Sequence, residues 1–343
     1  MIISPPLKVY FNFILQSVLP EIFSQTADIP RKVPLFLAPM EEITNYACRN
    51  ISRKFGADVV YSEFINSDAL IRNCKKAYSK LIFYAHERPF GIQIYGQDLH
   101  SMTEAAKIAA SYNPDLIDIN AGCWVKKISH RGAGAGLLRN IQHFQEIVSS
   151  ICRSVSVPVT VKTRLGWDEN NINIIEVSKI LQDCGVQAIT VHCRTRSQKM
   201  AGTPQWQWIE KIKSAGIFVP IIINGGILSI QDAKNVIRNT PADGLMIARG
   251  AIGNPWLFQE IKCFLSNLPF STISLSEKAA CALEHFILHI QNISETKAVY
   301  SFRKFLSSYI SGFPNVSVHR TELMQLKTKS EIIHLLTALI ERK

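Results

Sequence analysis

Short runs of apolar and β-branched residues recur about every 30 residues between positions 34 and 249. Each run ends in polar residues or glycine, and the segments between the runs have helical periodicity. The expected strands are Pro34–Met40, Asp58–Phe64, Phe90–Tyr95, Leu116–Asn120, Val157–Arg164, Ala188–Arg194, Val219–Asn224 and Gly244–Arg249. The clearest intervening helices are Met102–Tyr112, Ile141–Ser154, Ile174–Cys184 and Ser229–Arg238.

Runs that are apolar on both faces and alternate with helices are typical of a parallel sheet covered by helices. Eight such units suit a closed barrel. A doubly wound open sheet is the alternative, but no G-x-G-x-x-G motif follows the first expected strand. The pattern therefore predicts an α/β fold, with a (β/α)8 TIM barrel as the first expectation.

The pattern changes after Pro255. From Ser276 onward no clear strand is present, and helical periodicity appears over Lys278–Asn292, Ala298–Ser311 and Glu331–Arg342. We therefore expect a small all-α domain behind the barrel. The predicted organisation is an N-terminal extension over 1–30, a barrel over 31–265 and a helical domain over 276–343.

Composition narrows the class of protein. Hydrophobic residues make up 47% and charged residues 19% of the 343-residue chain, which is typical of folded globular proteins. The eight cysteines include no C-x-x-C pair, so no metal site is expected, and reduced thiols in a cytoplasmic protein are the simplest interpretation. No apolar run is long enough for a membrane helix. The formal net charge of +11 fits either a polyanionic partner, such as nucleic acid, or a merely basic protein.

Polar side chains gather where the expected strands end, and in a TIM barrel this face carries the chemistry. Side chains two apart on a strand share a face, so Lys162 and Arg164 project together. A single such residue is commonly structural, but several at the same end of successive strands indicate a site. The positions concerned are Pro39, Met40, Gln93, Asn120, Cys123, Lys162, Arg164, His192, Arg194, Arg196, Asn224 and Arg249.

Two glycine-containing turns follow the last two expected strands. Gly225-Gly226 comes after the seventh strand, and Arg249-Gly250 comes after the eighth. Loops at this place in a barrel often hold a phosphate through backbone N–H groups that glycine leaves uncovered. Because Arg249 would add a charge-assisted contact, the two turns together favour a phosphorylated cofactor.

Seven segments at these strand ends form an ordered set of motifs. They are Ala38-Pro39-Met40, Gln93–Gly96, Asp118–Cys123, Val161–Trp167, His192–Arg196, Asn224-Gly225-Gly226 and Arg249–Trp256. In this order they resemble the dihydrouridine synthases, the flavin enzymes that reduce uridine in transfer RNA. The match is nearest to the bacterial branch with a C-terminal helical domain, and it covers about residues 34–260.

The resemblance implies FMN in the mouth of the barrel and NADPH as its reductant. Pro39, Met40 and Gln93 would line the flavin ring, and Lys162 and His192 would reach its polar edge and ribityl chain. The phosphate region would be held by Asn224, Gly225, Gly226, Arg249 and Gly250. A lysine near the N1–O2 edge would stabilise negative charge on the reduced ring.

By resemblance, Cys123 is the catalytic residue. Reduction of the uracil 5,6-double bond takes a hydride from flavin N5 to C6 and a proton to C5, so an acid must stand across the base from the flavin. A thiol is mostly protonated at neutral pH and can serve as that acid. Lys126 and Lys127 follow Cys123 closely, and we expect that they could lower its pKa.

A uridine inside folded RNA must leave its stack to reach the flavin, and backbone contacts from lysine and arginine can offset that cost. The resemblance implies that the helical domain helps to hold the transfer RNA. The candidates for RNA contact are Asn120, Lys126, Lys127, Arg131, Arg194, Arg196, Arg303, Lys304 and Arg320. Arg194 and Arg196 are the best of these, because the strand would aim them at the mouth.

Two positions depart from the family pattern. Trp124 stands where the family usually has proline, and Glu41-Glu42 stands where small residues and an aspartate are common. Two alternatives stay open. One is an FMN barrel that reduces a small molecule, similar to dihydroorotate dehydrogenase, which the basic charge and the helical tail disfavour. The other is a catalytically impaired RNA-binding relative, in which Trp124 marks lost chemistry.

Overall fold

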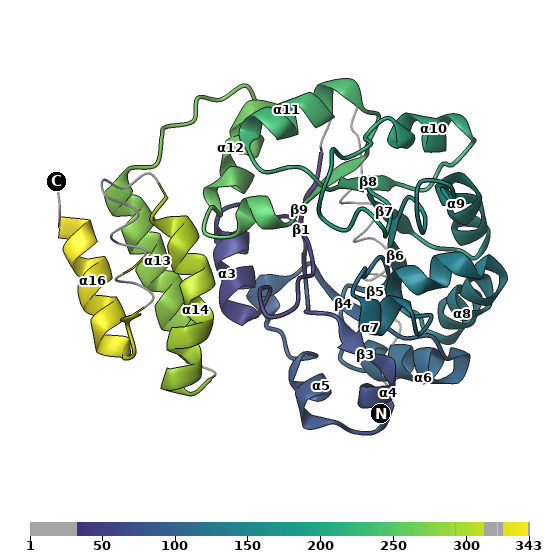
Figure 1. Ribbon diagram of the computed structural model, residues 1–343, viewed down its shortest axis with the longest axis horizontal. Coiled ribbons are helices and arrows are strands. Elements are labelled where there is room, and N and C mark those ends of the chain that lie inside the picture. Colours follow the sequence, from purple (N-terminus) through teal and green to yellow (C-terminus); the bar gives the residue numbers. More distant parts are fainter. Residues whose placement is uncertain (1–32, 292, 312–320, 322–324, 342–343) are drawn as a thin grey trace, which may run out of the picture.

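A computed structural model describes residues 33–291, 293–311, 321 and 325–341 of the chain. The expected N-terminal extension over residues 1–30 and the candidate Arg320 lie outside these residues. The described chain forms a barrel of strands wrapped by helices, with a group of helices beside it (Figure 1). Within the described residues, no helix is both long and apolar enough to cross a membrane.

Every strand pair in the sheet is parallel, and the strands follow the order β1-β9-β8-β7-β6-β5-β4-β2 with β3 beside β4. The ring closes where Phe36 pairs with Val59 and the Leu37 N–H donates to the Val59 carbonyl at 2.9 Å. The strands are β1 (Leu35–Leu37), β2 (Val60–Tyr61), β3 (Ile65–Asn66), β4 (Phe90–Tyr95), β5 (Leu116–Ala121), β6 (Val159–Arg164), β7 (Ala188–His192), β8 (Ile221–Asn224) and β9 (Gly244–Ile247). The predicted barrel is confirmed.

Each expected strand overlaps an observed strand, and six of the eight are shorter than expected; two of these differences matter for the site. The run Asp58–Phe64 pairs only over β2, and the short β3 follows it directly. The run Ala188–Arg194 ends as a strand at His192, after which the chain turns away from the sheet. This second difference changes where Arg194 and Arg196 lie.

Half of the barrel helices begin at a side chain that accepts a backbone N–H of the first turn. Asp98, for example, accepts a hydrogen bond from the Ser101 N–H at 2.7 Å at the start of α6, which satisfies a donor that the helix itself leaves free. The barrel helices are α3 (Tyr46–Lys54), α4 (Ser67–Ile71), α5 (Lys75–Ser79), α6 (Leu99–Ala110), α7 (Lys126–Ser129), α8 (Ile141–Ser154), α9 (Ile174–Asp183), α10 (Trp208–Ser214), α11 (Ile230–Asn239) and α12 (Trp256–Leu265).

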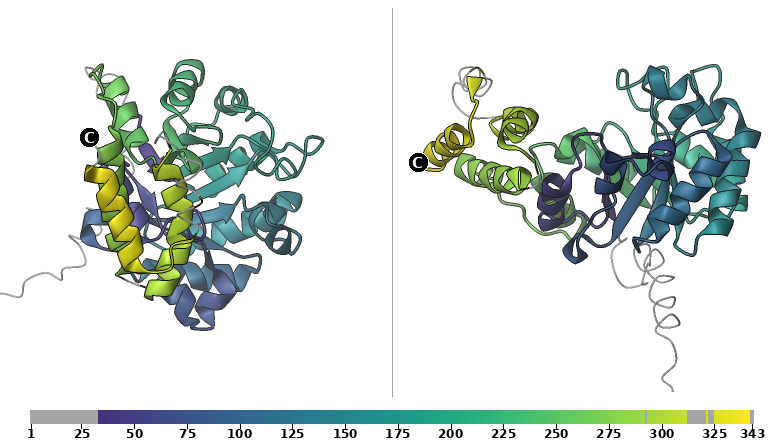
Figure 2. Two further views of the ribbon diagram at one scale, coloured as in Figure 1. Left: turned by 60° about the vertical axis from the view of Figure 1, so that its left-hand side comes forward. Right: turned by 90° about the horizontal axis from the view of Figure 1, so that it is seen from below.

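The C-terminal helices are α13 (Leu275–Ile290), α14 (Glu295–Tyr309) and α16 (Lys329–Glu341), and they agree with the helical periodicity of this region. They stand at one side of the barrel, next to α3 (Figures 1 and 2). Lys54 on α3 pairs with Glu284 on α13 at 2.6 Å, and the Asn45 amide lies 2.9 Å from His289 Nδ1. The helical group is therefore joined to the barrel by specific polar contacts.

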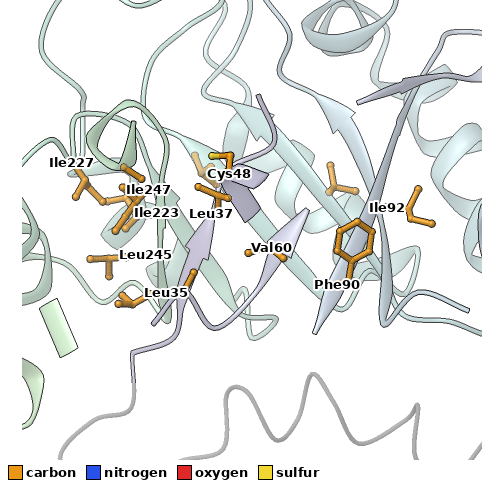
Figure 3. Close-up of a cluster of buried hydrophobic side chains, with 14 of the residues drawn as sticks. Leu35, Leu37, Cys48, Val60, Phe90, Ile92, Ile223, Ile227, Leu245 and Ile247 are labelled. Atoms are coloured by element: carbon orange, nitrogen blue, oxygen red, sulfur yellow. The ribbon is translucent and has the colours of Figure 1, made fainter. Parts of the chain in front are cut away.

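Two apolar clusters hold the barrel. Outward-facing strand residues such as Leu35, Leu37 and Ile223 form the larger cluster with the surrounding helices (Figure 3). Inward-facing residues fill the barrel itself with a second cluster: Phe36, Ala38, Val59, Tyr61, Leu116, Ala188, Ile222 and Met246. Toward the carboxyl ends of the strands this inner lining becomes polar, which positions the site.

The inner cluster leaves no room for a side chain at Gly91. A Cβ atom there would lie 2.5 Å from Tyr61 Cδ1 and 2.7 Å from Leu116 Cδ1. We expect Gly91→Ala to lower the free energy of unfolding by about 1–3 kcal/mol, because an overpacked core must shift. Denaturant unfolding measures this change. The cost should shrink when Tyr61→Leu removes the obstructing ring, and an equal cost in both backgrounds would contradict the steric explanation.

Candidate active site

Cys123 lies in the loop between β5 and α7, at the carboxyl end of the barrel. The Asn120 side-chain oxygen accepts the backbone N–H groups of Gly122 at 3.0 Å and Cys123 at 2.9 Å. Arg164 Nε donates to the Gly122 carbonyl at 2.7 Å, and the Ala135 N–H donates to the Cys123 carbonyl at 3.1 Å. The backbone on both sides of the thiol is thus held from three directions.

Burial raises the pKa of the Cys123 thiol, and the backbone at Val125 and the charges of Arg164 and Lys162 oppose this only in part. The thiol is therefore protonated across the neutral range. The cations that lower this pKa are Arg164 and Lys162, but burial outweighs them, and the effect expected of Lys126 and Lys127 stays a prediction. Both lysines are exposed on α7.

A buried polar group lies directly below this loop. Asp118 is paired in register with Gln93 on β4 and with Thr160 on β6, and all three are at most 3% exposed. Burial raises the pKa of Asp118 to about 6, against hydrogen bonds from Gln93 and Thr160. Sequence reasoning did not assign a role to Asp118 or Thr160. A carboxylate inside an otherwise apolar strand was the available signal.

Lys162 on β6 is oriented by Asn224 on β8. Its Nζ donates to Asn224 Oδ1 at 3.1 Å, while Asn224 Nδ2 donates to the Met246 carbonyl at 2.7 Å. Burial, with Arg164 nearby, lowers the pKa of Lys162 to about 8. The ammonium is therefore still mostly protonated at neutral pH and presents a poorly solvated positive charge at the end of the strands.

A hollow at the ends of β7, β8 and β9 is lined by His192, Arg194, Asn224, Gly225, Gly226 and Arg249, together with neighbouring apolar residues. Burial and the surrounding cations lower the pKa of His192 well below its ordinary value, so the ring is neutral. Arg194 Nη1 lies 3.4 Å from His192 Nε2. Because a guanidinium can only donate, Nε2 accepts and Nδ1 carries the proton.

The two glycines of this hollow have left-handed backbone, with φ of 102° at Gly225 and 80° at Gly226. A Cβ atom at Gly225 would lie 2.7 Å from His192 Cδ2, and one at Gly226 would meet Pro204. Among the described residues, neither backbone N–H has a hydrogen-bond partner. Arg249 stands exposed beside them with no acidic partner within the described chain. This arrangement is a cradle for an anion.

The structure places the three strand-end arginines inside the protein. Arg164 donates to the carbonyls of Thr195 and Lys199, and Arg194 donates to that of Gly202 at 2.8 Å. Arg196 is 8% exposed, donates to Ser129 Oγ and stacks 4.4 Å from the Trp167 ring centre. Their donors hold loops at the mouth, so RNA contact by Arg194 and Arg196 stays a prediction.

Two candidates on α14 also have partners. Arg303 Nη2 donates to the Leu326 carbonyl at 2.6 Å, and Lys304 Nζ donates to the carbonyl of Glu42 in the loop after β1. By contrast, Lys126, Lys127 and Arg131 are exposed near the Cys123 loop. Of the described candidates for RNA contact, these three cations are the exposed ones, and their side chains make no hydrogen bond or ion pair within the described residues.

The two residues that depart from the family pattern, Glu41 and Trp124, each lie next to a lysine. Both carboxylate oxygens of Glu41 accept from Lys80 Nζ at 2.7 Å, so the negative charge near the mouth is paired. Lys199 Nζ lies 5.7 Å from the centre of the half-buried Trp124 ring. Pro39 and Met40 are half-buried in the loop that follows β1, and their contact with a flavin ring stays a prediction.

Comparisons with known proteins agree with the motifs. A family model described as dihydrouridine synthase matches residues 36–343. The chain is 36% identical to tRNA-dihydrouridine synthase B of Pasteurella multocida (strain Pm70), over 82% of this chain and 85% of that protein. It is 35% identical to probable tRNA-dihydrouridine synthase 1 of Synechocystis sp., over 86% of this chain and 82% of that protein.

A solved structure supports the barrel fold, and it bears on the fold alone. Histamine dehydrogenase from Rhizobium sp. 4-9 superposes with a TM-score of 0.52 at 13% identity, over 79% of this chain and 51% of that one. The family expected from the motifs is confirmed by the family model and the relatives together. This chain belongs to the dihydrouridine synthase family of oxidoreductases.

Proposed function

We propose that this protein reduces uridine to 5,6-dihydrouridine in transfer RNA with FMN as its cofactor. The observation that carries the proposal is the protonated Cys123 thiol at the same barrel end as the buried Lys162 ammonium and the Gly225-Gly226 cradle. The relatives named above carry this activity in their names. Family membership disfavours both a small-molecule reductase and a non-enzymatic RNA binder.

The residues present fit FMN. A phosphate needs unpaired N–H donors and a cation, and Gly225, Gly226 and Arg249 offer both in a space that a Cβ atom would fill. The neutral His192 ring turns its Cδ2–Nε2 edge toward Gly225, and Gly250 packs against Ile227 and Leu228 of the same hollow. Pro39, Met40 and Gln93 are our candidates for lining the ring, and Asn224 fixes Lys162 beside it.

When bound, the flavin supplies the hydride that reaches C6 of the uracil ring. Cys123 donates its proton to C5, so that one hydride and one proton together saturate the double bond. The thiolate that remains lies near Arg164 and Lys162, whose charges stabilise it until a solvent proton restores the thiol. The Lys162 ammonium would offset negative charge on a flavin held at this end of the barrel.

Transfer RNA would approach across the Cys123 loop. Lys126, Lys127 and Arg131 can neutralise phosphates there, and the Trp124 ring offers a stacking surface next to the thiol. Asn120, Arg194, Arg196, Arg303 and Lys304 remain candidates for RNA contact, although their described bonds are within the protein. We propose NADPH as the reductant, and the cytoplasm, where the eight free thiols stay reduced, as the location.

The direct test is mass spectrometry of transfer-RNA uridines from cells that lack this protein. We expect one uridine position to lose the mass increase of two hydrogen atoms that dihydrouridine carries. Re-expression should restore it at the same position. An unchanged modification profile would exclude this reaction.

Cys123→Ala should leave the purified protein yellow with bound FMN but lower turnover on transfer RNA by at least about a hundredfold, since general acid catalysis typically contributes that much. Single-turnover reoxidation of the reduced protein by transfer RNA measures the loss. Cys74→Ala, which removes an exposed thiol on the N-terminal side of α5, is the matched control. Full activity in Cys123→Ala would remove Cys123 as the acid.

Lys162→Ala should weaken flavin retention or slow flavin reduction, because a buried positive charge beside the cofactor is lost. Flavin absorbance after gel filtration and stopped-flow reduction by NADPH report the two effects separately. Lys179→Ala removes an exposed lysine on α9 and serves as the control. The proposed role of Lys162 is refuted by flavin binding and reduction that match the unaltered protein.

A further inference from the structure

The buried polar group below Cys123 is one continuous chain of hydrogen bonds. It begins at Asp118, whose Oδ1 accepts from Thr160 Oγ1 at 2.6 Å and whose Oδ2 accepts from Gln93 Nε2 at 2.6 Å. It continues through Asn120, whose Nδ2 donates to Gln93 Oε1 at 2.9 Å. It ends on the backbone, because Asn120 Oδ1 accepts the N–H of Cys123 at 2.9 Å.

The carboxylate at one end sets the direction of every bond in this chain. An ionised carboxylate can only accept hydrogen bonds, so Gln93 must turn its amide nitrogen toward Asp118. The Gln93 oxygen then faces Asn120, and Asn120 must donate to it through its side-chain nitrogen. Only in that orientation does the Asn120 oxygen face the N–H groups of Gly122 and Cys123.

The Gly122 and Cys123 N–H groups, which can only donate, require the same direction from the other end of the chain of bonds. Asp118 and Gln93 are fully buried and Asn120 is 7% exposed, so water cannot substitute freely for a lost bond. An amide is nearly symmetric in shape, and packing alone would accept either orientation. The charged or titratable groups near Asp118 are Lys162 from β6 and Tyr61 from β2.

We propose that Asp118 is a positioning residue for Cys123, which it holds in place through the oriented side-chain amides of Gln93 and Asn120. Asp118 is separated from the thiol by two side chains and acts only through them. The inference deepens the proposed function, since it matters for turnover only if Cys123 is the acid. We call the chain of hydrogen bonds from Asp118 through Gln93 and Asn120 to the Cys123 N–H the relay. Its effect on the Cys123 loop can be tested without any turnover.

Asn120→Asp is the informative single change. The new carboxylate can still accept the N–H groups of Gly122 and Cys123. Its second oxygen, however, faces the Gln93 oxygen. The Gln93 side chain has only one NH2 group, so along this line it cannot donate to the carboxylates at positions 118 and 120 at the same time. The relay then needs one extra proton, shared between the two carboxyl groups. Two neighbouring carboxylates repel each other, which raises the pKa at which the pair loses its shared proton. The shared proton is therefore present at acid pH and lost as the pH rises.

Asp118→Asn combined with Asn120→Asp removes the conflict by reversing the relay. The new amide at position 118 donates to Gln93 Oε1, Gln93 Nε2 donates to the new carboxylate, and that carboxylate accepts the N–H groups of the Cys123 loop. Every buried group is satisfied without the extra proton. Both variants carry the same residue at position 120, so their difference isolates the relay from any direct effect of that residue on the thiol or on RNA.

The experiment is alkylation of the FMN-loaded protein with iodoacetamide, with the rate at Cys123 followed by peptide mass spectrometry. At about pH 5.5 the single and double variants should react alike. At about pH 8.5 the single variant should react about tenfold faster than the double variant, because its loop is no longer held. Asp118→Asn alone should stay close to the unaltered protein, because its amide oxygen can still accept from Gln93 and the loop N–H groups still hold the Asn120 oxygen toward them.

Equal rates in the single and double variants at alkaline pH would overturn the proposal. Asn120→Asp alone can fail to fold, which circular dichroism would show. In that case a double variant that is equally poorly folded would also overturn the proposal. Recovery of folding by the second substitution would instead support the relay. The alkylation rates do not depend on whether the protein reduces uridine. A failure of the proposed function and a failure of this inference can therefore be distinguished.

Discussion

A barrel whose interior is polar at one end must satisfy its buried inward-facing donors and acceptors largely through other groups of the protein. This constraint governs the site. Asp118, Gln93 and Asn120 satisfy one another on the adjacent strands β4 and β5. Lys162 on β6 and Asn224 on β8 form a second such pair. Each bond that satisfies a buried group also fixes the direction of a functional side chain, so stability and placement of the site have the same source.

Much of this fold could be predicted from the sequence, because a fully buried parallel strand and an amphipathic helix each leave a clear pattern. The helix expected over Ile141–Ser154 has those bounds in the structure. The arginines after β7 show the limit of the pattern. Strand alternation was extended past His192, but the chain turns there, and Arg194 folds back onto the carbonyl of Gly202. Periodicity describes regular backbone and carries no information on where a loop returns.

The candidate site shows a second limit. Cys123, Lys162 and His192 could be singled out because their side chains are unusual at strand ends. Asp118 could not be given a role, since its importance lies in what it does to Gln93 and Asn120. Similarly, the electrostatic environment of Cys123 depends on burial, which outweighs nearby cations and raises the pKa that neighbouring lysines were expected to lower.

The bond from Lys304 to the Glu42 carbonyl crosses from α14 to the loop that follows Met40. The helical group is thus tied to a loop beside the barrel mouth, and its removal would free a segment that adjoins the proposed ring-binding residues. An RNA that displaces this lysine would exchange an internal tether for a phosphate contact. Substrate engagement and the shape of the mouth would then be thermodynamically linked, with each biasing the other by the same free energy.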